Sequence, residues 1–124
     1  ITGAGGFIGS HLAEELVRRG AKVKAMVHYD SRPQRSNLEL ADPKLTAQMQ
    51  FLAGDVADPH FMYRAVEGCD AVFHLAALIG IPFSYVAPSA YVQTNITGTI
   101  MVVAAPGPGR DRAGPVAVYG HAHE

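Results

Sequence analysis

The chain has 124 residues, of which 48% are hydrophobic and 17% are charged, so it has the size and composition of about one globular domain. Its formal net charge of -1 argues against a surface for nucleic acid or an anionic membrane, and no apolar run is long enough to span a bilayer. The single cysteine, Cys69, excludes an internal disulfide and fits a reducing, cytoplasmic compartment.

The first ten residues form a glycine-rich stretch, with Gly3, Gly6 and Gly9 spaced by threes. They lead into an amphipathic segment ending at Gly20, and its regular apolar positions predict a helix with one buried stripe: Ile8, Leu12 and Leu16. A glycine turn that opens a helix exposes backbone N–H groups to an anion. We interpret it as the pyrophosphate turn of a dinucleotide fold, in which the three glycines serve the turn, the close approach and the helix packing. The alternative is a plain strand-to-helix turn.

A second strand is predicted over residues 21–27, and its end is where a dinucleotide fold distinguishes its cofactors. Asp30 would bind the adenosine ribose hydroxyls, whereas Arg32 would favour a 2'-phosphate. A solvated turn explains either residue equally well. The cofactor expected from this region is NAD or NADP, with a slight preference for NAD.

The middle of the chain continues the alternation of strands and helices. Residues 31–48 are polar and contain Pro33 and Pro43, which predicts a loop with one short helical turn. A third strand is predicted over residues 49–53. Asp58 and Pro59 are the cap and first residue of a helix that ends at Gly68, and the apolar run 71–77 predicts a buried parallel strand. The pattern predicts an α/β, Rossmann-like doubly wound parallel sheet.

Four motifs come in order along this pattern: Thr-Gly-x-x-Gly-x-x-Gly at 2–9, Gly-Asp-Val at 54–56, His-Leu-Ala-Ala at 74–77 and Thr-Asn-Ile-x-Gly-Thr at 94–99. Together they resemble the N-terminal part of the extended short-chain dehydrogenase/reductase family, the NAD(P)-dependent nucleotide-sugar epimerases and dehydratases. Within that family, residues 27–29 and 77–88 are most similar to the inverting UDP-N-acetylglucosamine 4,6-dehydratases.

The resemblance implies a set of cofactor-binding residues. They are Gly3, Gly6, Phe7 and Ile8 at the pyrophosphate, Asp30 near the ribose, Asp55 and Val56 at the adenine, Leu75, Ala76 and Ala77 beside the nicotinamide ribose, and Asn95 at the cofactor end of the fourth helix. Each has a purely structural alternative. Asp55 could cap a turn, residues 75–77 could be core, and Asn95 could be a helix polar group bonded to backbone.

The chain also departs from the family pattern. Val27 stands where the family usually has Asp, and Pro115 stands at the catalytic Ser/Thr position. The catalytic Tyr-x-x-x-Lys is absent, and Tyr119 resembles the structural tyrosine of a Val-Tyr-Gly motif. Three prolines and three glycines in residues 106–115 cannot continue a helix into a central strand. We therefore expect a partial dinucleotide-binding domain over 1–105 and a divergent tail over 106–124, for which a shifted reading frame is one explanation.

Two functional hypotheses follow. The first is an NAD(P)-binding fragment of a nucleotide-sugar epimerase or dehydratase, itself inactive, whose full enzyme transfers hydride from the sugar C4 and forms a homodimer through the fourth helix. In this interpretation most of the first strand is missing, because the chain begins at Ile1 rather than Met, and the C-terminal part is missing, because the catalytic Tyr-x-x-x-Lys does not appear. The alternative is a non-catalytic NAD(P)-binding or redox-sensing Rossmann protein. No metal site is expected, and the His121, His123 and Glu124 cluster is interpreted as a frayed tail.

Overall fold

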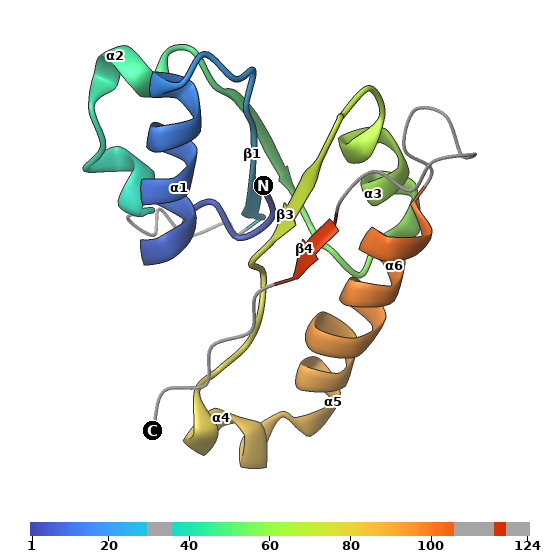
Figure 1. Cartoon of the computed structure of the whole chain (residues 1–124). Coiled ribbons are helices and arrows are strands. Elements are labelled where there is room, and N and C mark those ends of the chain that lie inside the picture. The colour runs from blue at the N-terminus through green and yellow to red at the C-terminus, as the bar shows by residue number, and fades with distance from the viewer. Residues whose placement is uncertain (30–35, 106–115, 119–124) are drawn as a thin grey trace.

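The structure is a computed structural model that describes residues 1–29 and 36–105 together with the backbone of residues 116–118 (Figure 1). In chain order its elements are α1 (Phe7–Arg18), β1 (Lys24–His28), the 3-10 helix η1 (Asn37–Glu39), α2 (Pro43–Thr46), β2 (Gln50–Gly54), α3 (Pro59–Val66), β3 (Val72–His74), α4 (Ile81–Val86), α5 (Pro88–Tyr91), the π-helix η2 (Val92–Thr97), α6 (Gly98–Ala104) and β4 (Val116–Val118).

The strands form two parallel pairs, β1 with β2 and β3 with β4. The N-terminal segment, residues 1–4, lies between these pairs and bonds to both. Met26 N donates to Ile1 O at 2.9 Å and Ala4 N donates to Met26 O at 3.0 Å. On the other side Thr2 N donates to Phe73 O at 2.9 Å, and Thr2 bridges His74 in parallel. The sheet therefore runs in the order β2, β1, N-terminal segment, β3, β4.

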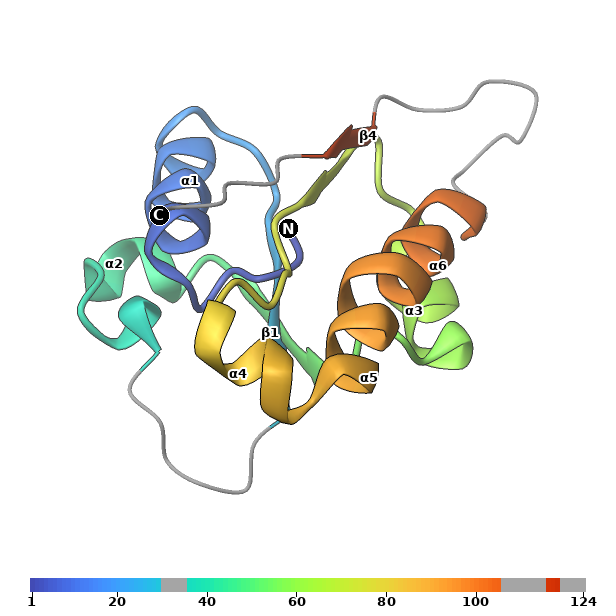
Figure 2. The ribbon, with the colours of Figure 1, turned by 90° about the horizontal axis from the view of Figure 1, so that it is seen from below.

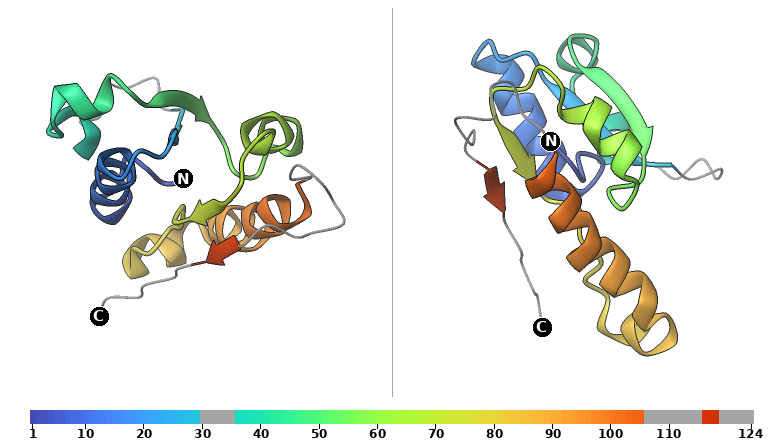
Figure 3. Two further views of the ribbon diagram at one scale, coloured as in Figure 1. Left: turned by 45° about the horizontal axis from the view of Figure 1, so that its top comes forward. Right: turned by 90° about the vertical axis from the view of Figure 1, so that its right-hand side faces the viewer.

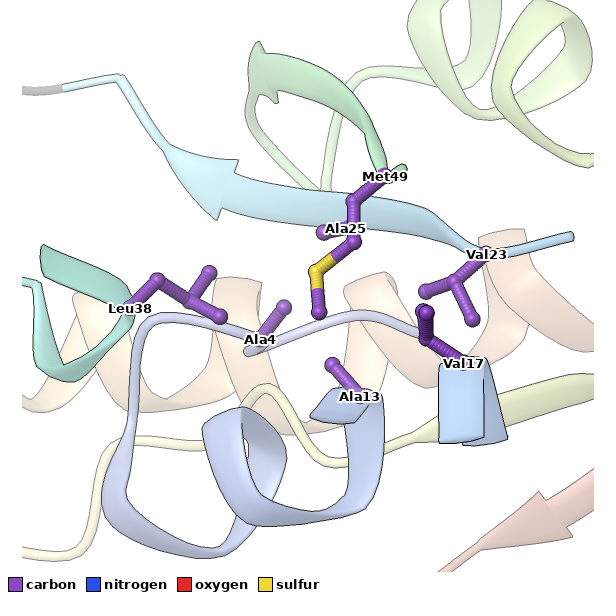
Figure 4. Close-up of a cluster of buried hydrophobic side chains, with 7 residues drawn as sticks. All are labelled: Ala4, Ala13, Val17, Val23, Ala25, Leu38 and Met49. Atoms are coloured by element: carbon purple, nitrogen blue, oxygen red, sulfur yellow. The ribbon is translucent and has the colours of Figure 1, made fainter. Parts of the chain in front are cut away.

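The helices cover both faces of this sheet, with α1 and α2 on one side and α3 and α6 on the other (Figure 2). Each side has its own cluster of buried hydrophobic side chains. The α1 side contains Ala4, Ala13, Val17, Val23, Ala25, Leu38 and Met49 (Figure 4), and the α3 side contains Met26, Val56, Met62, Val66 and Val102. This layering, with a partial parallel sheet at its centre, confirms the predicted α/β doubly wound class.

Helices α5, η2 and α6 follow one another as a single column that extends away from the sheet, with α4 at its far end (Figure 3). Its outer surface carries exposed apolar residues: Val92, Ile96, Ile100 and Val103. Among the described residues, no helix has both the length and the apolar character needed to cross a membrane.

Local sequence signals place several of these elements correctly. The Asp58 side chain caps α3 by accepting from His60 N at 2.9 Å and Phe61 N at 3.3 Å, with Pro59 at the start of the helix. The predicted strand over residues 71–77 is wrong in length, because β3 ends at His74. After His74 the Leu75 N–H is shared between the Thr2 carbonyl, at 3.3 Å, and the Thr2 side chain, and the Ala76 N–H bonds to that side chain, as described below.

Two further expectations from the sequence need correction. The second strand begins at Lys24 rather than at residue 21. The sequence did not predict β4, which lies within the region expected as a divergent tail and pairs with β3 in the register Val72 to Val116. The prolines and glycines of 106–115 precede this strand, so they do not interrupt its ladder.

Met62 provides a test of the packing on the α3 side, because its side chain is 1% exposed at the centre of that cluster. We expect Met62→Ala to lower the free energy of unfolding by about 2–5 kcal/mol, since it leaves a cavity in a packed core. The neighbouring Tyr63→Ala, at a residue 56% exposed, is the matched control and should change stability by about 0.5 kcal/mol or less. Urea denaturation followed by circular dichroism measures both. Equal losses in the two variants would contradict the described packing.

Candidate functional site

A cavity of about 490 Å³ lies where the carboxyl ends of β1, β2 and β3 meet the glycine turn. Its lining comes from five parts of the chain: Gly3, Gly6, Met26, His28, Gly54, Asp55, Val56, Leu75, Ala76, Ala77, Leu78, Ala90, Gln93 and Thr94. The N-terminal segment is bonded to β1 on one side and to β3 on the other, and the chain continues first to β1 and β2 and only later to β3. The order of the strands therefore reverses at this segment, and the cavity lies at that switch point. Open α/β sheets bind their ligands at this position.

Gly3 and Gly9 are required by the fold of the turn itself. Gly3 has a φ of 68°, and a Cβ there would lie 2.8 Å from Ala76 N and Leu75 C. A Cβ on Gly9 would overlap the Gly3 carbonyl and lie 2.9 Å from the Ala4 Cα. The first glycine therefore permits the left-handed turn, and the third lets α1 pack directly on that turn.

Gly6 is different, because neither a positive φ nor an overlap of an added Cβ with the described protein requires glycine there. Its φ of -74° is accessible to any residue, and a Cβ there would meet only Gly3 O, at 3.3 Å. Gly6 lines the cavity and precedes α1, whose ladder begins with the bond from Ser10 N to Gly6 O at 3.0 Å. The N–H groups of residues 7–9 lie ahead of that ladder, at the positive end of the helix dipole. The turn is thus open to an anion on its cavity side.

The side chains of Phe7 and Ile8 are 71% and 46% exposed and are not among those lining the cavity. Any contact they make with a bound anion would come from their backbone N–H groups. Asp30 lies outside the described residues. The end of β1 instead brings His28 to the cavity, a residue that the sequence analysis did not single out.

Asp55 and Val56 follow β2 and both line the cavity. The Asp55 Oδ1 atom accepts from Ala57 N at 2.9 Å, so this carboxylate also caps a turn, as the structural alternative proposed. Val56 is 4% exposed and packs on α6, where a Cβ on Gly98 would lie 2.6 Å from Val56 Cγ2. One residue therefore offers a polar group at the cavity and the other offers an apolar wall anchored in the core.

Residues 75–78, the cavity strip, follow β3 and all line the cavity. The strip is bonded at both ends by side chains. The Thr2 Oγ1 atom accepts from Leu75 N at 3.1 Å and from Ala76 N at 3.2 Å. Asn95 bonds to both sides of the Leu78 backbone, accepting from its N–H and donating to its carbonyl, each at 2.9 Å. Asn95 itself does not line the cavity. It bonds to the backbone, which was the structural alternative to cofactor binding in the sequence analysis.

His74 lies between these two anchors and is 3% exposed. Its Nδ1 atom is 2.7 Å from Thr2 Oγ1, and its Nε2 atom is 3.0 Å from Thr99 Oγ1. Burial lowers the pKa of His74 below its usual value of 6.5, because the charged ring loses its solvation. The unfolded chain then binds a proton more readily than the folded chain, so this group lowers the stability of the fold as the pH falls below about 6.5.

The cavity contains other residues that sequence reasoning missed, notably Gln93 and Thr94. Both belong to η2, and π-helical turns are rare and occur often at functional sites. The available signal was the Thr-Asn motif at residues 94–95, of which only the Asn was singled out. Helical periodicity does not predict a π-turn, so which of these side chains faces the cavity could not be read from the sequence.

Comparisons with known proteins agree with this geometry. The model of the GDP-mannose 4,6-dehydratase family matches residues 1–107. The UDP-N-acetyl-alpha-D-glucosaminuronate decarboxylase of Bacillus cytotoxicus is 36% identical over 99 residues, which are 80% of this chain and 29% of that protein.

Two solved structures show the same relationship. A double mutant of the dTDP-glucose 4,6-dehydratase DesIV from Streptomyces venezuelae, with NAD bound, is 30% identical with a TM-score of 0.67, over 82% of this chain and 33% of that one. A UDP-glucose 4-epimerase from Thermotoga maritima, with UDP-glucose, is 28% identical with a TM-score of 0.64. The match covers 82% of this chain and 31% of the epimerase chain. The chain thus spans between 29% and 33% of the length of these three proteins.

The packing of α1 on the glycine turn can be tested at Gly9. We expect Gly9→Ala to destabilise the fold by about 1–3 kcal/mol, because the added methyl group meets backbone atoms that cannot move aside independently. His11→Ala, at an exposed position of the same helix, should stay within about 0.5 kcal/mol of the parent. Thermal denaturation of the two variants measures the difference. A Gly9→Ala protein as stable as the parent would mean that α1 does not contact the turn as described.

Proposed function

Because this chain belongs to the extended short-chain dehydrogenase/reductase family of NAD-dependent epimerases and dehydratases, we propose that its cavity binds NAD or NADP. We further propose that the chain is the cofactor-binding part of an enzyme that acts on a nucleotide sugar by hydride transfer at C4. Relatives and structural neighbours with these activities support the proposal. NAD is slightly favoured over NADP, since the Streptomyces neighbour was solved with NAD.

The observation that carries the proposal is the glycine at position 6. Its backbone conformation does not require glycine, and an added Cβ would meet one atom, the Gly3 carbonyl oxygen at 3.3 Å, which is a tight contact but not an overlap; Gly6 lines the cavity at the start of α1. A pyrophosphate would use the cavity side of Gly6, because a side chain at this position would fill the place of the anion. The residues present therefore fit a dinucleotide at the point where its charge must be bound.

The roles of the other lining residues are those that the family resemblance implies, and their place on the cavity supports them. Asp55 and Val56 would contact the adenine, and the cavity strip would face the nicotinamide ribose. Asn95 would contribute by holding Leu78 in place rather than by touching the cofactor. When bound, the nicotinamide ring supplies the hydride acceptor. The protein groups described here bind and orient, and among them no base for the sugar hydroxyl is assigned.

The helical column offers support for a dimer of the intact subunit. Its apolar residues Val92, Ile96, Ile100 and Val103 recur every three or four positions and are 52% to 61% exposed. A stripe of this kind on a helix surface is typical of a face that is buried in an assembly. We propose that a homodimer of the whole enzyme buries it, while the nucleotide sugar is bound with the help of residues beyond this chain.

The role of Gly6 gives a direct test of cofactor binding. We expect Gly6→Val to weaken NAD+ binding at least about tenfold, or 1.4 kcal/mol, because its side chain would occupy the place of the pyrophosphate. Isothermal titration with NAD+ and with NADP+ measures the affinity, and circular dichroism checks that the variant is folded. Lys22→Val is the control, since Lys22 is exposed and precedes β1 at the end of the strand opposite the cavity. A folded Gly6→Val protein with the parent affinity would refute the assignment.

We also propose that the chain of 124 residues does not by itself catalyse the reaction. Its sequence contains no Tyr-x-x-x-Lys, and a positioned base contributes typically about 100- to 10,000-fold to such a proton transfer. Incubation with NAD+ or NADP+ and a panel of UDP-, GDP- and dTDP-sugars should yield no 4-keto product above a control without protein. A dTDP-glucose 4,6-dehydratase serves as the positive control. Reproducible turnover would contradict the proposal and mean that another residue of this chain acts as the base, with Tyr85 and Tyr119 the first to replace by Phe.

A further inference from the structure

A continuous chain of hydrogen bonds runs behind the cavity and joins the two anchors of the cavity strip. Thr2 holds the amides of Leu75 and Ala76, and Asn95 holds Leu78. Thr99 Oγ1 donates to the Asn95 backbone oxygen at 2.7 Å. The His74 ring closes the gap, because one of its nitrogens meets Thr2 and the other meets Thr99. The two ends of the strip are therefore linked through a single buried imidazole.

The donors and acceptors in this chain allow one arrangement of protons. A hydroxyl has one proton to donate. Thr99 uses its proton on the Asn95 carbonyl, so it must accept from His74, which places a proton on Nε2. In the neutral ring Nδ1 is then an acceptor, so Thr2 donates to it, while the Thr2 hydroxyl accepts from Ala76 N and shares Leu75 N with the Thr2 carbonyl. His74 is thus the neutral tautomer with its proton on Nε2.

A second proton on the ring cannot be accommodated without breaking a bond. It would go to Nδ1 and point at Thr2 Oγ1, where it would be a third donor to an atom with two lone pairs. The Leu75 amide, the Ala76 amide or the ring itself would have to release the hydroxyl, and Leu75 alone of the two amides keeps a second acceptor, the Thr2 carbonyl. Protonation of a residue that does not line the cavity would then loosen the residues that do.

We propose that His74 is a positioning residue for the cofactor: as the neutral ring it fixes the cavity strip, and its protonation releases the strip and weakens the binding of a nicotinamide dinucleotide. The second half of this statement rests on the proposed function, whereas the first half does not. The acid dependence of affinity would arise behind the cavity, in a group that makes no contact with the cofactor.

Among the described residues, no charged side chain bonds to the His74 ring. The groups within bonding distance of the ring are the hydroxyls of Thr2 and Thr99, from the N-terminal segment and α6. The paired strand β4 is Val-Ala-Val in sequence and carries no titratable residue. Desolvation is the cause of the lowered pKa, and no charged side chain among the described residues contributes to it. The loss of affinity is therefore expected to begin below pH 6.5 and not above it.

The first experiment needs neither a variant nor a cofactor. In protein labelled with 15N, two-dimensional NMR reports the tautomer of each histidine ring and the backbone amides of Leu75, Ala76 and Leu78. We expect the neutral tautomer with the proton on Nε2 at pH 7.5, and we expect these amides to shift together with the titration of the His74 ring. A proton on Nδ1 at pH 7.5, or strip amides that do not respond as His74 titrates, would overturn the proposal.

The second experiment measures the affinity for NAD+ between pH 8.0 and 5.5. NAD+ is the probe because the 2'-phosphate of NADP+ would itself titrate near pH 6. The dissociation constant should stay level from pH 8.0 to below pH 6.5, because the pKa of His74 is lowered, and at lower pH it should rise by up to about tenfold per pH unit, the limit for one linked proton. In His74→Gln this rise should be abolished, whatever the affinity at pH 8.0. Circular dichroism at each pH confirms that the protein is folded where binding is measured.

Two further histidine variants make the assignment specific. His60→Gln, on the exposed start of α3, should keep the pH dependence of the parent. His28→Gln removes the histidine that lines the cavity. The dissociation constant of this variant for NAD+ should rise with falling pH as in the parent, even if its value at pH 8.0 differs. If the pH dependence of NAD+ affinity were lost in His28→Gln, or persisted in His74→Gln, the role of His74 would be overturned. Failure of NAD+ to bind even at pH 8.0 would count against the proposed function, and the amide titration would still decide whether His74 fixes the strip.

Discussion

The buried hydroxyl of Thr2 joins parts of the molecule that lie more than 70 residues apart in the sequence. Thr2 is 3% exposed, in the segment that bonds β1 on one side and β3 on the other. Its side chain holds the first two amides after β3 and one nitrogen of His74. Unpaired polar groups in such a place would cost about 1–3 kcal/mol each, so the geometry of these bonds is tightly constrained. Thr2 thus ties the end of β3 to the start of the cavity through its hydroxyl and its backbone carbonyl.

The three glycines of the turn, Gly3, Gly6 and Gly9, differ in the reason for which a side chain is absent. Gly3 permits a positive φ and a close contact with the cavity strip, and Gly9 lets a helix rest on the turn. Gly6 meets neither need and instead leaves the cavity side open. Stability and ligand access are therefore carried by different positions within seven residues. A turn built only for packing would not require the middle glycine.

The cavity strip is apolar in sequence, and the polar groups that hold it, Thr2, His74 and Asn95, are not among the residues that line the cavity. Side chains that might have been expected to touch a ligand, such as Asn95, are instead bonded to the backbone of the strip. These bonds fix the backbone of the cavity strip, and in our proposal they persist only while the His74 ring is neutral. Within the π-helix η2, Asn95 bonds to Leu78 while Gln93 and Thr94 line the cavity.

The sequence by itself determined the fold class, the glycine turn, the capped start of α3 at Asp58 and Pro59, and the family. These features follow from local rules, because turns, caps and hydrophobic periodicity depend on residues close together in the chain. Only the tertiary structure decided that β3 ends at His74, that Asn95 holds Leu78, and that His28, Gln93 and Thr94 reach the cavity. It also placed β4 beside β3, beyond a proline-rich stretch from which no strand was predicted. Each of these depends on partners distant in sequence, and the direction in which a buried polar group bonds is set by those partners rather than by its neighbours in the chain.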